Sequence, residues 1–483
     1  VMTCVLGMGV RREREIRAFV KTPFYRVVSS IALEGESFEG EWRAVEGSRY
    51  FQSPVLYKEN GFKKKEDAQK LICELSAQQP LICTVEKIER KKENKNPPLL
   101  FNLAELQNVC SKLFKISPDE TLSIVQDLYE KKLVTYPRTD ARVLSTAVAK
   151  EIYKNISGLR NYPQAGGAAQ GALELGAYKN IAKTRYTNDK QITDHYAIIP
   201  TGQGLGALKG LSLTAQRVYE TIVRRFLSIF YPPAVYQKVS LVTKMENESF
   251  FSSFKVLLSE GYLKIAANSF AKKSMAEASG KTPESEGEGE VSCDEALLAA
   301  LQKLKKGDIL NINGLGIKEG ETSPPKRYNS GSMILAMENA GQLIEDEDLR
   351  SQIKGSGIGT SATRAEILKK LFNIRYLSLN KKTQVITPTL QGEMIYDVVN
   401  CSIRQLLNPE LTASWEKGLT YVAEGSITEQ EYMDKLEHFV RIRTKQVEDS
   451  HFQYALRQFF DAAAQFYKKP ERETAMKKRQ NTL

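Results

Sequence analysis

Tyr136 and Arg138 are the residues whose types and spacing best fit a covalent reaction with a phosphate. They lie in the segment LVTYPRTD at 133–140. Pro137 disfavours helix at the residue before it, so Tyr136 is expected in an extended stretch. Residues i and i+2 of such a stretch share one face, so the phenol and the guanidinium can converge on one phosphate. Arginine stays charged and matches phosphate geometry, whereas a tyrosine with a pKa of about 10 needs activation.

Further cations and a glycine-rich segment predict an anion-binding surface. Lys131, Lys132 and Arg142 add positive charge near Tyr136. The segment GSGIGTSATRAE at 355–366 places glycines and hydroxyl residues before a helix. Free backbone N–H groups at a helix start bind anions. The alternative interpretation is a glycine-rich loop with an ordinary threonine cap.

Several segments, in order along the chain, resemble the type IA DNA topoisomerases of the topoisomerase III branch, of bacterial or mobile-element type. TLSIVQDLYE at 121–130 followed by LVTYPRTD resembles the active-site signature, although Ala141 stands where the family usually has serine. TDHYAIIPT at 193–201 resembles a second block. TSPPKRY with MEN, then GIGTSATRA, and finally TPT with Gly392 resemble later blocks. The resemblance covers roughly residues 1–440.

The resemblance implies roles for individual residues. Tyr136 is expected to attack the DNA backbone, Arg138 to steady the phosphate, and His195 to approach it. Together with the cations near Tyr136, the residues expected to bind DNA are Lys131, Arg142, Arg327, Thr360, Thr363 and Arg364. The implied reaction is ATP-independent cleavage of single-stranded DNA through a 5′-phosphotyrosine, followed by strand passage and religation, which relaxes or decatenates DNA. No nucleotide-binding P-loop motif is present.

Family members open with a Toprim domain that carries a catalytic glutamate and an acidic Mg²⁺ cluster. No such block occurs here, and residues 1–17 resemble a stretch that follows Toprim in the family. We therefore expect a fragment whose Mg²⁺ site lies in the missing domain, with no metal site of its own. The expectation for the isolated chain is that it binds single-stranded DNA but cleaves and relaxes poorly.

Periodicity and turn residues predict the elements that position these groups. Strands are expected at 24–46, 81–90, 235–244 and 249–266, and helices at 65–76 and 213–230. Two further helices precede Tyr136, capped by Asn102 with Glu105 and by Ser117 with Pro118 and Glu120. They suit a helix-turn-helix-like body or a generic helical bundle. A linker is predicted at 91–98, a loose Gly/Ala-rich loop at 163–176 and an acidic flexible loop at 272–292.

The predicted fold class is multidomain α+β, and the resemblance implies the toroidal gate of type IA enzymes. Because β-rich segments flank a helical block, we expect a β-rich arch domain with a helical domain inserted into it. The predicted units are 1–94 and 206–292 for the arch, 95–205 for the inserted helical domain with Tyr136, 293–440 for a mostly helical single-stranded-DNA-binding domain, and 441–483 for a helical tail.

Composition narrows the class of partner. The chain has 483 residues and a net charge of +11, which favours a polyanionic partner. There is no apolar run of about 18 residues, so no membrane span is expected. The six cysteines form no C-x-x-C pair, which argues against a zinc ribbon and fits a reducing cytoplasm. We expect a monomer in the bacterial cytoplasm, associated with the nucleoid or a plasmid, that acts on single-stranded and on supercoiled or catenated DNA, with a helicase as a candidate partner.

Three other classes remain open. The chain can be a non-catalytic single-stranded DNA-binding remnant, in which Tyr136 only stacks on a base. A tyrosine recombinase needs an R…H-x-x-R…Y array with its tyrosine near the C-terminus, whereas Tyr136 lies in the first third. A degenerate gene product is the third. A covalent DNA adduct that is lost in Tyr136→Phe separates an enzyme from a binding remnant.

Overall fold

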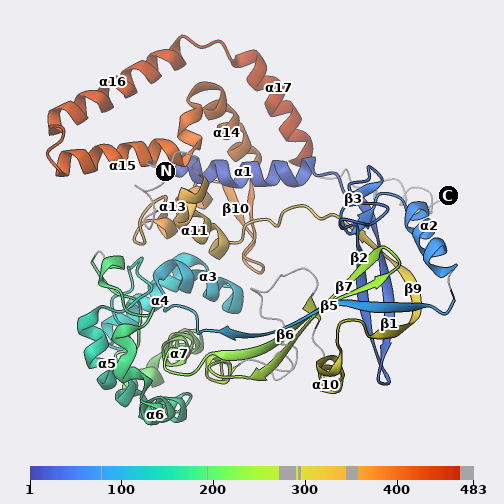
Figure 1. Ribbon diagram of the computed structural model, residues 1–483. Helices are drawn as coiled ribbons and strands as arrows, with labels where there is room; N and C mark the ends of the chain where they lie inside the picture. The colour runs from blue at the N-terminus through green and yellow to red at the C-terminus, as the bar shows by residue number, and fades with distance from the viewer. Residues whose placement is uncertain (78, 193, 271–289, 292–294, 344–356, 468–483) are drawn as a thin grey trace, which may run out of the picture.

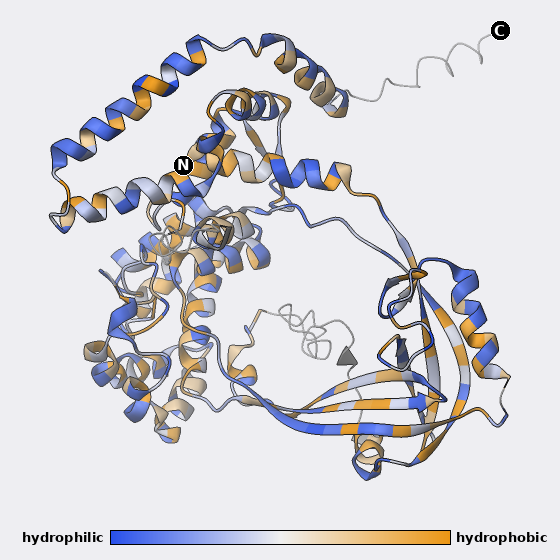
Figure 2. Ribbon diagram, turned by 45° about the horizontal axis from the view of Figure 1, so that its top comes forward, coloured by the Kyte–Doolittle hydropathy of each residue, from blue (hydrophilic) through white to orange (hydrophobic). Residues whose placement is uncertain are grey.

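The computed structural model describes residues 1–77, 79–192, 194–270, 290–291, 295–343 and 357–467. Figure 1 shows a twisted sheet at one side of the molecule and a group of helices at the other, with the first helix of the chain and its C-terminal helices above them. In the view of Figure 2 these parts form the sides of an open ring of ribbons. The mixture of helices and antiparallel strands confirms the predicted multidomain α+β class.

A nine-stranded sheet forms the β-rich part, and within the described residues all its pairings but one are antiparallel. Its order is β2-β7-β6-β5-β9-β1-β4-β3, with β8 parallel to β7 and an additional β1–β2 pairing that closes the sheet like a barrel. The strands are β1 (Pro23–Leu33), β2 (Glu36–Arg43), β3 (Leu56–Lys58), β4 (Gly61–Phe62), β5 (Ile82–Lys95), β6 (Ala234–Met245), β7 (Glu248–Ser259), β8 (Glu290–Val291) and β9 (Ile309–Glu321).

Alternate residues of these strands fill the interior of the barrel, as the two-residue period of a strand requires. Val27, Ile31 and Trp42 are fully buried there. In register, Val27 lies opposite Ile317 of β9, and Ile88 of β5 lies opposite Leu241 of β6. Helices α2 (Lys65–Ser76) and α10 (Glu295–Lys303) cover this core, so the helix predicted at 65–76 is confirmed.

Three predictions about this part were wrong. β9 lies in a region predicted to be mostly helical, because alternation of Leu310 and Ile312 with exposed neighbours makes it a half-buried strand. The predicted linker at 91–98 is occupied as far as Lys95 by β5, whose charged residues stay exposed while their backbone pairs with β6. The strand expected at 249–266 ends at Ser259, and the short helix α8 (Leu263–Ala266) follows it.

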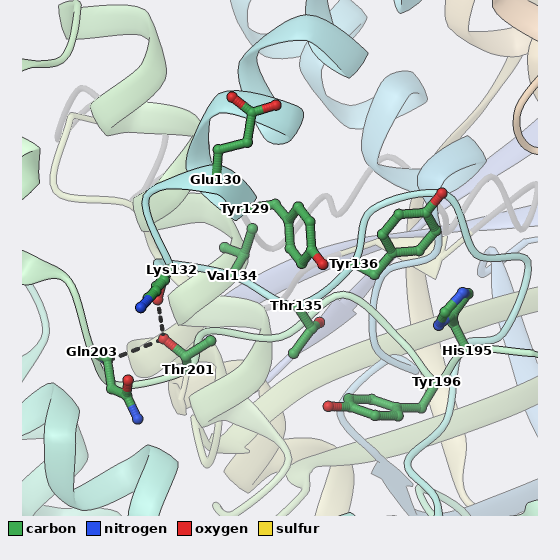
Figure 3. A pocket seen from close by; sticks show the side chains of 10 residues that line it. All are labelled: Tyr129, Glu130, Lys132, Val134, Thr135, Tyr136, His195, Tyr196, Thr201 and Gln203. Carbon is green, nitrogen blue, oxygen red and sulfur yellow. Dashed lines mark hydrogen bonds between the residues drawn. The ribbon is translucent and has the colours of Figure 1, made fainter.

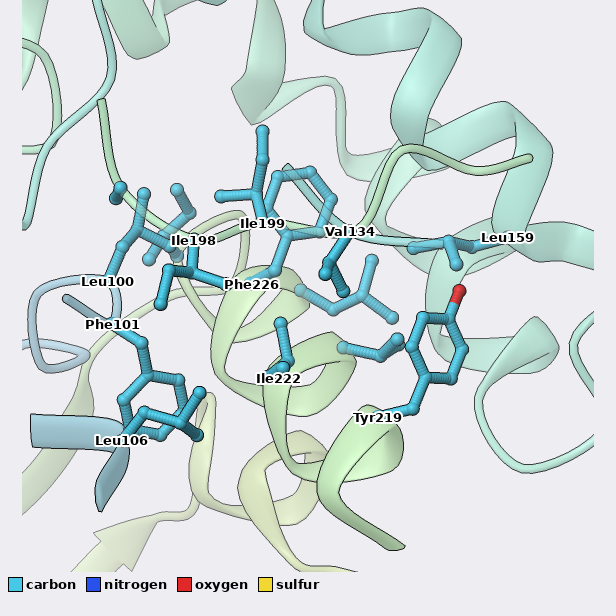
Figure 4. Packing of buried hydrophobic residues seen from close by; sticks show 14 of the residues in the cluster. Leu100, Phe101, Leu106, Val134, Leu159, Ile198, Ile199, Tyr219, Ile222 and Phe226 are labelled. Carbon is cyan, nitrogen blue, oxygen red and sulfur yellow. The ribbon is translucent and has the colours of Figure 1, made fainter. Parts of the chain in front are cut away.

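The first helical core packs around α3 (Leu103–Phe114), α4 (Pro118–Glu130), α5 (Thr146–Gly158), α6 (Gly166–Leu175) and α7 (Leu213–Ser228). Figure 4 shows Phe226 and Ile222 of α7 meeting Ile198 and Ile199 inside it. Asn102 and Ser117 cap α3 and α4 by accepting the amides of Glu105 and Glu120, at 2.8 and 3.2 Å. Both predicted helix starts are therefore confirmed.

α6 replaces the loose loop predicted at 163–176. Its glycines allow close packing: a Cβ on Gly166 would lie 2.3 Å from the Arg160 carbonyl oxygen, and one on Gly171 would lie 2.5 Å from the Tyr231 hydroxyl. Ala169 and Ala172 are fully buried on the same helix. Small residues here make room for neighbours, although their composition resembles that of a flexible loop.

The second helical core joins both ends of the described chain. It contains α1 (Met2–Ala18), α11 (Ser330–Glu338), α13 (Arg364–Asn373), the hairpin of β10 (Leu377–Leu379) and β11 (Ile386–Pro388), and α14 (Leu390–Ser402). Helices α15 (Pro409–Ala423), α16 (Glu429–Glu448) and α17 (Gln453–Ala464) follow it. α17 returns against α14, as Figure 1 shows.

These cores cut across two of the predicted domain boundaries. α1 packs with residues 330–407 and not with the sheet, because Val5, Leu6 and Val10 point into the second helical core. α7 packs with the first helical core, although it follows the boundary expected at 206. The acidic loop predicted at 272–292 lies outside the described residues apart from β8. Among the described helices, none combines the length and hydropathy that a bilayer crossing needs.

Candidate active site

The Tyr136 loop, residues 131–144, begins where α4 ends. Lys132 has a positive φ of 59°, which turns the chain back towards the helix it has just left. The Leu133 amide donates to the Leu128 carbonyl at 2.9 Å, and Leu133 and Val134 are buried. Tyr136 follows them and is half-buried. A well-packed core therefore holds the start of the loop and leaves the tyrosine at its surface.

Two threonines tie this loop to the segment that carries His195. The Thr135 hydroxyl donates to the Ala197 carbonyl at 3.1 Å and accepts the Ile199 amide at 3.0 Å. On the other side of Tyr136, the Thr139 hydroxyl donates to the His195 carbonyl at 2.7 Å. Because these bonds lie on both sides of Tyr136 and reach the backbone of residues 195–199, they hold the Tyr136 loop against the segment that carries His195.

The rings of Tyr136 and His195 are in contact. Their centroids are 4.4 Å apart with the planes tilted by 43°, and Tyr129 of α4 meets Tyr136 edge-on at 5.5 Å. Figure 3 shows the Tyr136 hydroxyl pointing away from the His195 ring and out of the aromatic group. The phenol oxygen is thus presented at an edge, where a phosphate can approach it.

A cavity of about 620 Å³ opens beside these rings. Its lining residues are Tyr129, Glu130, Lys132, Val134, Thr135, Tyr136, His195, Tyr196, Thr201 and Gln203. Burial raises the pKa of Tyr196, so that phenol stays neutral and serves as an aromatic wall. The size is within the range of about 300–1,000 Å³ typical of small-ligand sites, and aromatic rings with polar groups at the edge suit a nucleotide.

Arg138 stands apart from this ring group. Its side chain is exposed, and within the described part of the chain no hydrogen bond, ion pair or ring contact joins it to another residue. The structure therefore brings Tyr136 and His195 together, while Arg138 is left free for an external anion. Its convergence with Tyr136 on one phosphate stays a prediction.

The residues of this pocket do not fit a Mg²⁺ ion. A hard divalent cation takes several oxygen ligands, carboxylates above all. Glu130 is the one carboxylate that lines the described pocket. Across the described residues, no group of three or more His, Cys, Asp or Glu side chains is placed to hold a metal. No step below is routed through a metal ion.

Three cations predicted to bind DNA have protein partners. Lys131 forms an ion pair with Asp127 on α4. The Arg142 Nε donates to the Leu100 carbonyl at 3.2 Å. Arg327 makes a two-pronged pair with the buried Glu13 at 2.7 and 2.9 Å, which lowers the pKa of that carboxyl. Whether these residues also bind DNA stays a prediction.

The glycine–threonine segment lies where α11 ends and α13 begins. Gly357 has φ +65°, and a Cβ there would lie 2.3 Å from the Glu338 carbonyl oxygen, so only glycine fits. Thr360 and Thr363 are exposed, their hydroxyls 3.1 Å apart, with the Thr360 amide donating to Thr363 Oγ1 at 2.9 Å. Their hydroxyls are at the surface, as a phosphate contact requires.

Arg364 has a different environment. Its side chain is 1% exposed, and Nη1 lies 2.7 Å from Oδ1 of Asp140 in the Tyr136 loop. The structure thus joins two predicted motifs through an arginine that faces protein.

Sequence reasoning missed the residues that position the site. Thr135 and Thr139 lie inside the recognised motif, yet their hydroxyl bonds to 195–199 need the fold to be seen. Tyr129 carries a usable signal, since it is an aromatic residue in the last turn of α4, directly before the Tyr136 loop. Glu338 lies in the matched MEN segment without an assigned role.

The chain matches the family model described as DNA topoisomerase over residues 1–434. The chain therefore belongs to the DNA topoisomerase family. Within that family it is a type IA, topoisomerase III-like protein. Two relatives named DNA topoisomerase 3, from Bacillus licheniformis and Bacillus subtilis, are each 30% identical to it over 454 residues. The alignment covers 93% of this chain and 56% of each relative, so the chain spans about half the length of these curated relatives.

A solved structure agrees on the fold. Full-length topoisomerase I from Thermotoga maritima superposes with a TM-score of 0.60 at 21% identity, covering 93% of this chain and 62% of that one. The shared architecture confirms the predicted fold class.

Proposed function

We propose that this chain carries the strand-cutting part of a type IA topoisomerase, with Tyr136 as the nucleophile on single-stranded DNA. The geometry of the ring pair supports this most directly: a half-buried tyrosine, in contact with an imidazole, directs its hydroxyl to an open edge. The exposed Arg138 two residues on supplies a cation without a competing partner among the described residues.

The proposed step is a transesterification. The Tyr136 oxygen forms a bond to phosphorus while the bond from phosphorus to the 3′ oxygen breaks, which leaves a 5′-phosphotyrosine. The phenol proton is transferred, in net terms, to the departing 3′ oxygen, which becomes a free hydroxyl. Arg138 and His195 stabilise the charge on the phosphoryl oxygens. Reversal of the step reseals the strand without ATP.

The aromatic pocket gives this reaction its substrate class. An unpaired base next to the cut phosphate can stack on Tyr129 or Tyr196, whereas a base in a duplex is already stacked and paired. Exposed Lys132 and Gln203 lie at the far end of the pocket. Lys131, Arg142, Thr360 and Thr363 extend the proposed DNA surface. This arrangement favours single-stranded DNA over duplex.

For the complete enzyme we further propose relaxation or decatenation of DNA, with Mg²⁺ held by residues other than those of the pocket. A bacterial cytoplasmic setting agrees with the source of the relatives. A monomeric state and a helicase partner remain proposals of the same kind.

Trapping a covalent adduct tests the proposal. We expect a 5′-nucleotide adduct when the chain is incubated with an end-labelled single-stranded oligonucleotide, stable on a denaturing gel and absent in Tyr136→Phe. Tyr129→Phe is the matched control, because it removes the neighbouring phenol of the same pocket and should keep the adduct. A wild-type chain that binds the oligonucleotide without any adduct, or an adduct that persists in Tyr136→Phe, contradicts the proposal and favours a non-catalytic binding role.

A further inference from the structure

Asn102, Asp140, Glu338 and Arg364 form a polar cluster, the seam cluster, between the two helical cores. Arg364 Nη1 lies 2.7 Å from Asp140 Oδ1 and 4.0 Å from Glu338 Oε1. The Asn102 amide nitrogen donates to the Asp140 carbonyl at 3.1 Å and to Glu338 Oε1 at 2.6 Å. Asn102 and Asp140 belong to the first core, and Glu338 and Arg364 to the second, so the cluster joins the cores.

Around the cluster, α3 and α11 meet through close polar contacts and through buried Ala104, which packs into the apolar second core. Ser111 and Ser330 share a buried hydroxyl–hydroxyl bond of 3.0 Å. The backbones approach so closely that a Cβ on Gly331 would lie 2.6 Å from the Asn108 Cα. The seam cluster adds charged hydrogen bonds to this packing and is the part of the seam that reaches the Tyr136 loop.

The cluster is connected to the reactive rings by a short chain of bonds. Asp140 adjoins Thr139, whose hydroxyl donates to the His195 carbonyl at 2.7 Å. The Thr139 carbonyl in turn accepts the Leu103 amide at 3.1 Å, beside the capping residue Asn102. Asp140 is therefore linked through Thr139 to the Tyr136 loop and to the backbone of His195.

Arg364 is poorly placed to bind DNA while it serves this cluster. With 1% of its side chain exposed, it cannot reach an external phosphate without leaving Asp140. Without Arg364, the Asp140 and Glu338 carboxylates would lose the buried cation that lies close to both of them, and removing one partner of a buried ion pair is destabilising.

We propose that Arg364 is a positioning residue: by binding Asp140 it holds the Tyr136 loop on the second helical core in the conformation that aligns Tyr136 with His195. This inference rests on the proposed function for its catalytic consequence, but the contact itself is tested independently of any reaction. Separation of the cores would break the Arg364–Asp140 pair and release the loop.

Three variants of the full chain separate positioning from DNA contact and from general packing. Arg364→Met removes the cation and keeps much of the volume. Asp140→Asn keeps the shape of the other partner, whose side chain is 27% exposed and tolerant of change. Lys369→Met is the matched control, because Lys369 on the same helix pairs with Asp119 of α4 at 3.1 Å across the same two cores, but with both side chains exposed.

Hydrogen exchange at the amides of residues 139–144 is the first readout. We expect at least about tenfold faster exchange in Arg364→Met and in Asp140→Asn, and less than about twofold in Lys369→Met. The double variant of Asp140 and Arg364 should exchange no faster than the faster single variant, because each acts through the other. Arg364→Lys should restore part of the protection.

Binding of a labelled single-stranded oligonucleotide at several salt concentrations is the second readout. We expect Arg364→Met to keep the wild-type salt slope, since a lost phosphate contact would lower that slope by about one. Adduct yield, where wild type forms an adduct, should fall in both cluster variants. Unchanged exchange in Asp140→Asn, or a reduced salt slope with unchanged exchange in Arg364→Met, overturns the positioning role. Failure of the proposed function would appear differently, as a wild-type chain without adduct whose exchange pattern still follows the variants.

Discussion

The Tyr136 loop and the second helical core use cationic side chains in opposite ways. In the Tyr136 loop, Arg138 and Lys132 are exposed, and among the described residues neither side chain has a hydrogen-bonded or ion-paired partner. In the second core, Arg14 binds Asp397 at 2.8 Å and Glu393 at 3.1 Å, and Arg17 binds Glu393 at 2.6 Å. Both carboxylates are almost fully buried.

The chain has a net charge of +11, but a cationic side chain contributes to DNA binding only where no carboxylate of the protein already holds it. An arginine already held by a buried carboxylate contributes to the fold, and a phosphate would have to compete with that carboxylate. An arginine without a protein partner gains hydrogen bonds when a phosphate arrives. Arg138 and Lys132, unlike Arg14 and Arg17, are therefore free to bind a polyanion.

The largest expected effect comes from removing Arg138, the exposed arginine two residues after Tyr136. Arg138→Ala should lower adduct yield about 10²- to 10³-fold, the size of effect found when one preorganised donor is lost from a transition state. Its melting temperature should match wild type, because the side chain has no partner in the described structure. Arg138→Lys should recover part of the activity, since it keeps the charge and loses the fork. A large loss of stability in Arg138→Ala would show that Arg138 stabilises the fold, as Arg14 and Arg17 do, and would contradict its assignment as a free cation.

Arg327 provides the opposite case. Arg327→Ala breaks the two-pronged bond to the buried Glu13 and should lower the free energy of unfolding by about 1–2 kcal/mol, a modest value because Arg327 is partly exposed. Denaturant unfolding measures this change. Single-stranded DNA binding by the folded variant should keep the wild-type salt slope. A slope reduced by about one, with unchanged stability, would instead assign Arg327 to DNA, as its motif suggested.

The smallest effect is a difference in pH dependence between two buried carboxylates. Burial raises the pKa of Glu338, so the folded state binds that proton more tightly than the unfolded chain does. Its contribution to stability is greatest below the ordinary value of 4.5 and falls as pH rises through the raised pKa. Glu338→Gln should therefore gain in melting temperature relative to wild type between pH 4 and pH 7.

Glu13 should behave in the reverse sense. The hydrogen bonds from Arg327 lower its pKa, so its stabilising effect is present above the ordinary value of 4.5 and is lost as pH falls through the lowered pKa. Glu13→Gln should then lose melting temperature relative to wild type as pH rises from acid to neutral. Parallel trends in the two variants would contradict the assignment of one carboxylate to burial and the other to pairing.

Short-range sequence signals correctly predicted the helices that lead to Tyr136. The caps at Asn102 and Ser117 and the break at Pro137 are short-range signals, and they place Tyr136 just past a helix end. The motif at 193–201 singled out His195, whose ring lies against that of Tyr136, while its role at the phosphate stays a prediction. Each of these signals is contained in a few neighbouring residues.

Long-range pairing explains what the sequence did not reveal. Arg364 and Asp140 are 224 residues apart, and no local pattern distinguishes an arginine that binds a carboxylate from one that binds a phosphate. β9 was missed because its position between β5 and β1 depends on a sheet assembled from distant segments. The glycines of α6 serve close packing, which only the neighbouring side chains reveal.

The identity of the residue that becomes joined to DNA is the most direct test of the proposed active site. Proteolysis of the trapped adduct, followed by tandem mass spectrometry, identifies the modified peptide and residue. The structure predicts a single nucleotide-bearing peptide with the 5′-phosphate on Tyr136. Modification of Tyr129 or Tyr196, which line the same pocket, would contradict this account, as would cleaved oligonucleotide with no modified peptide.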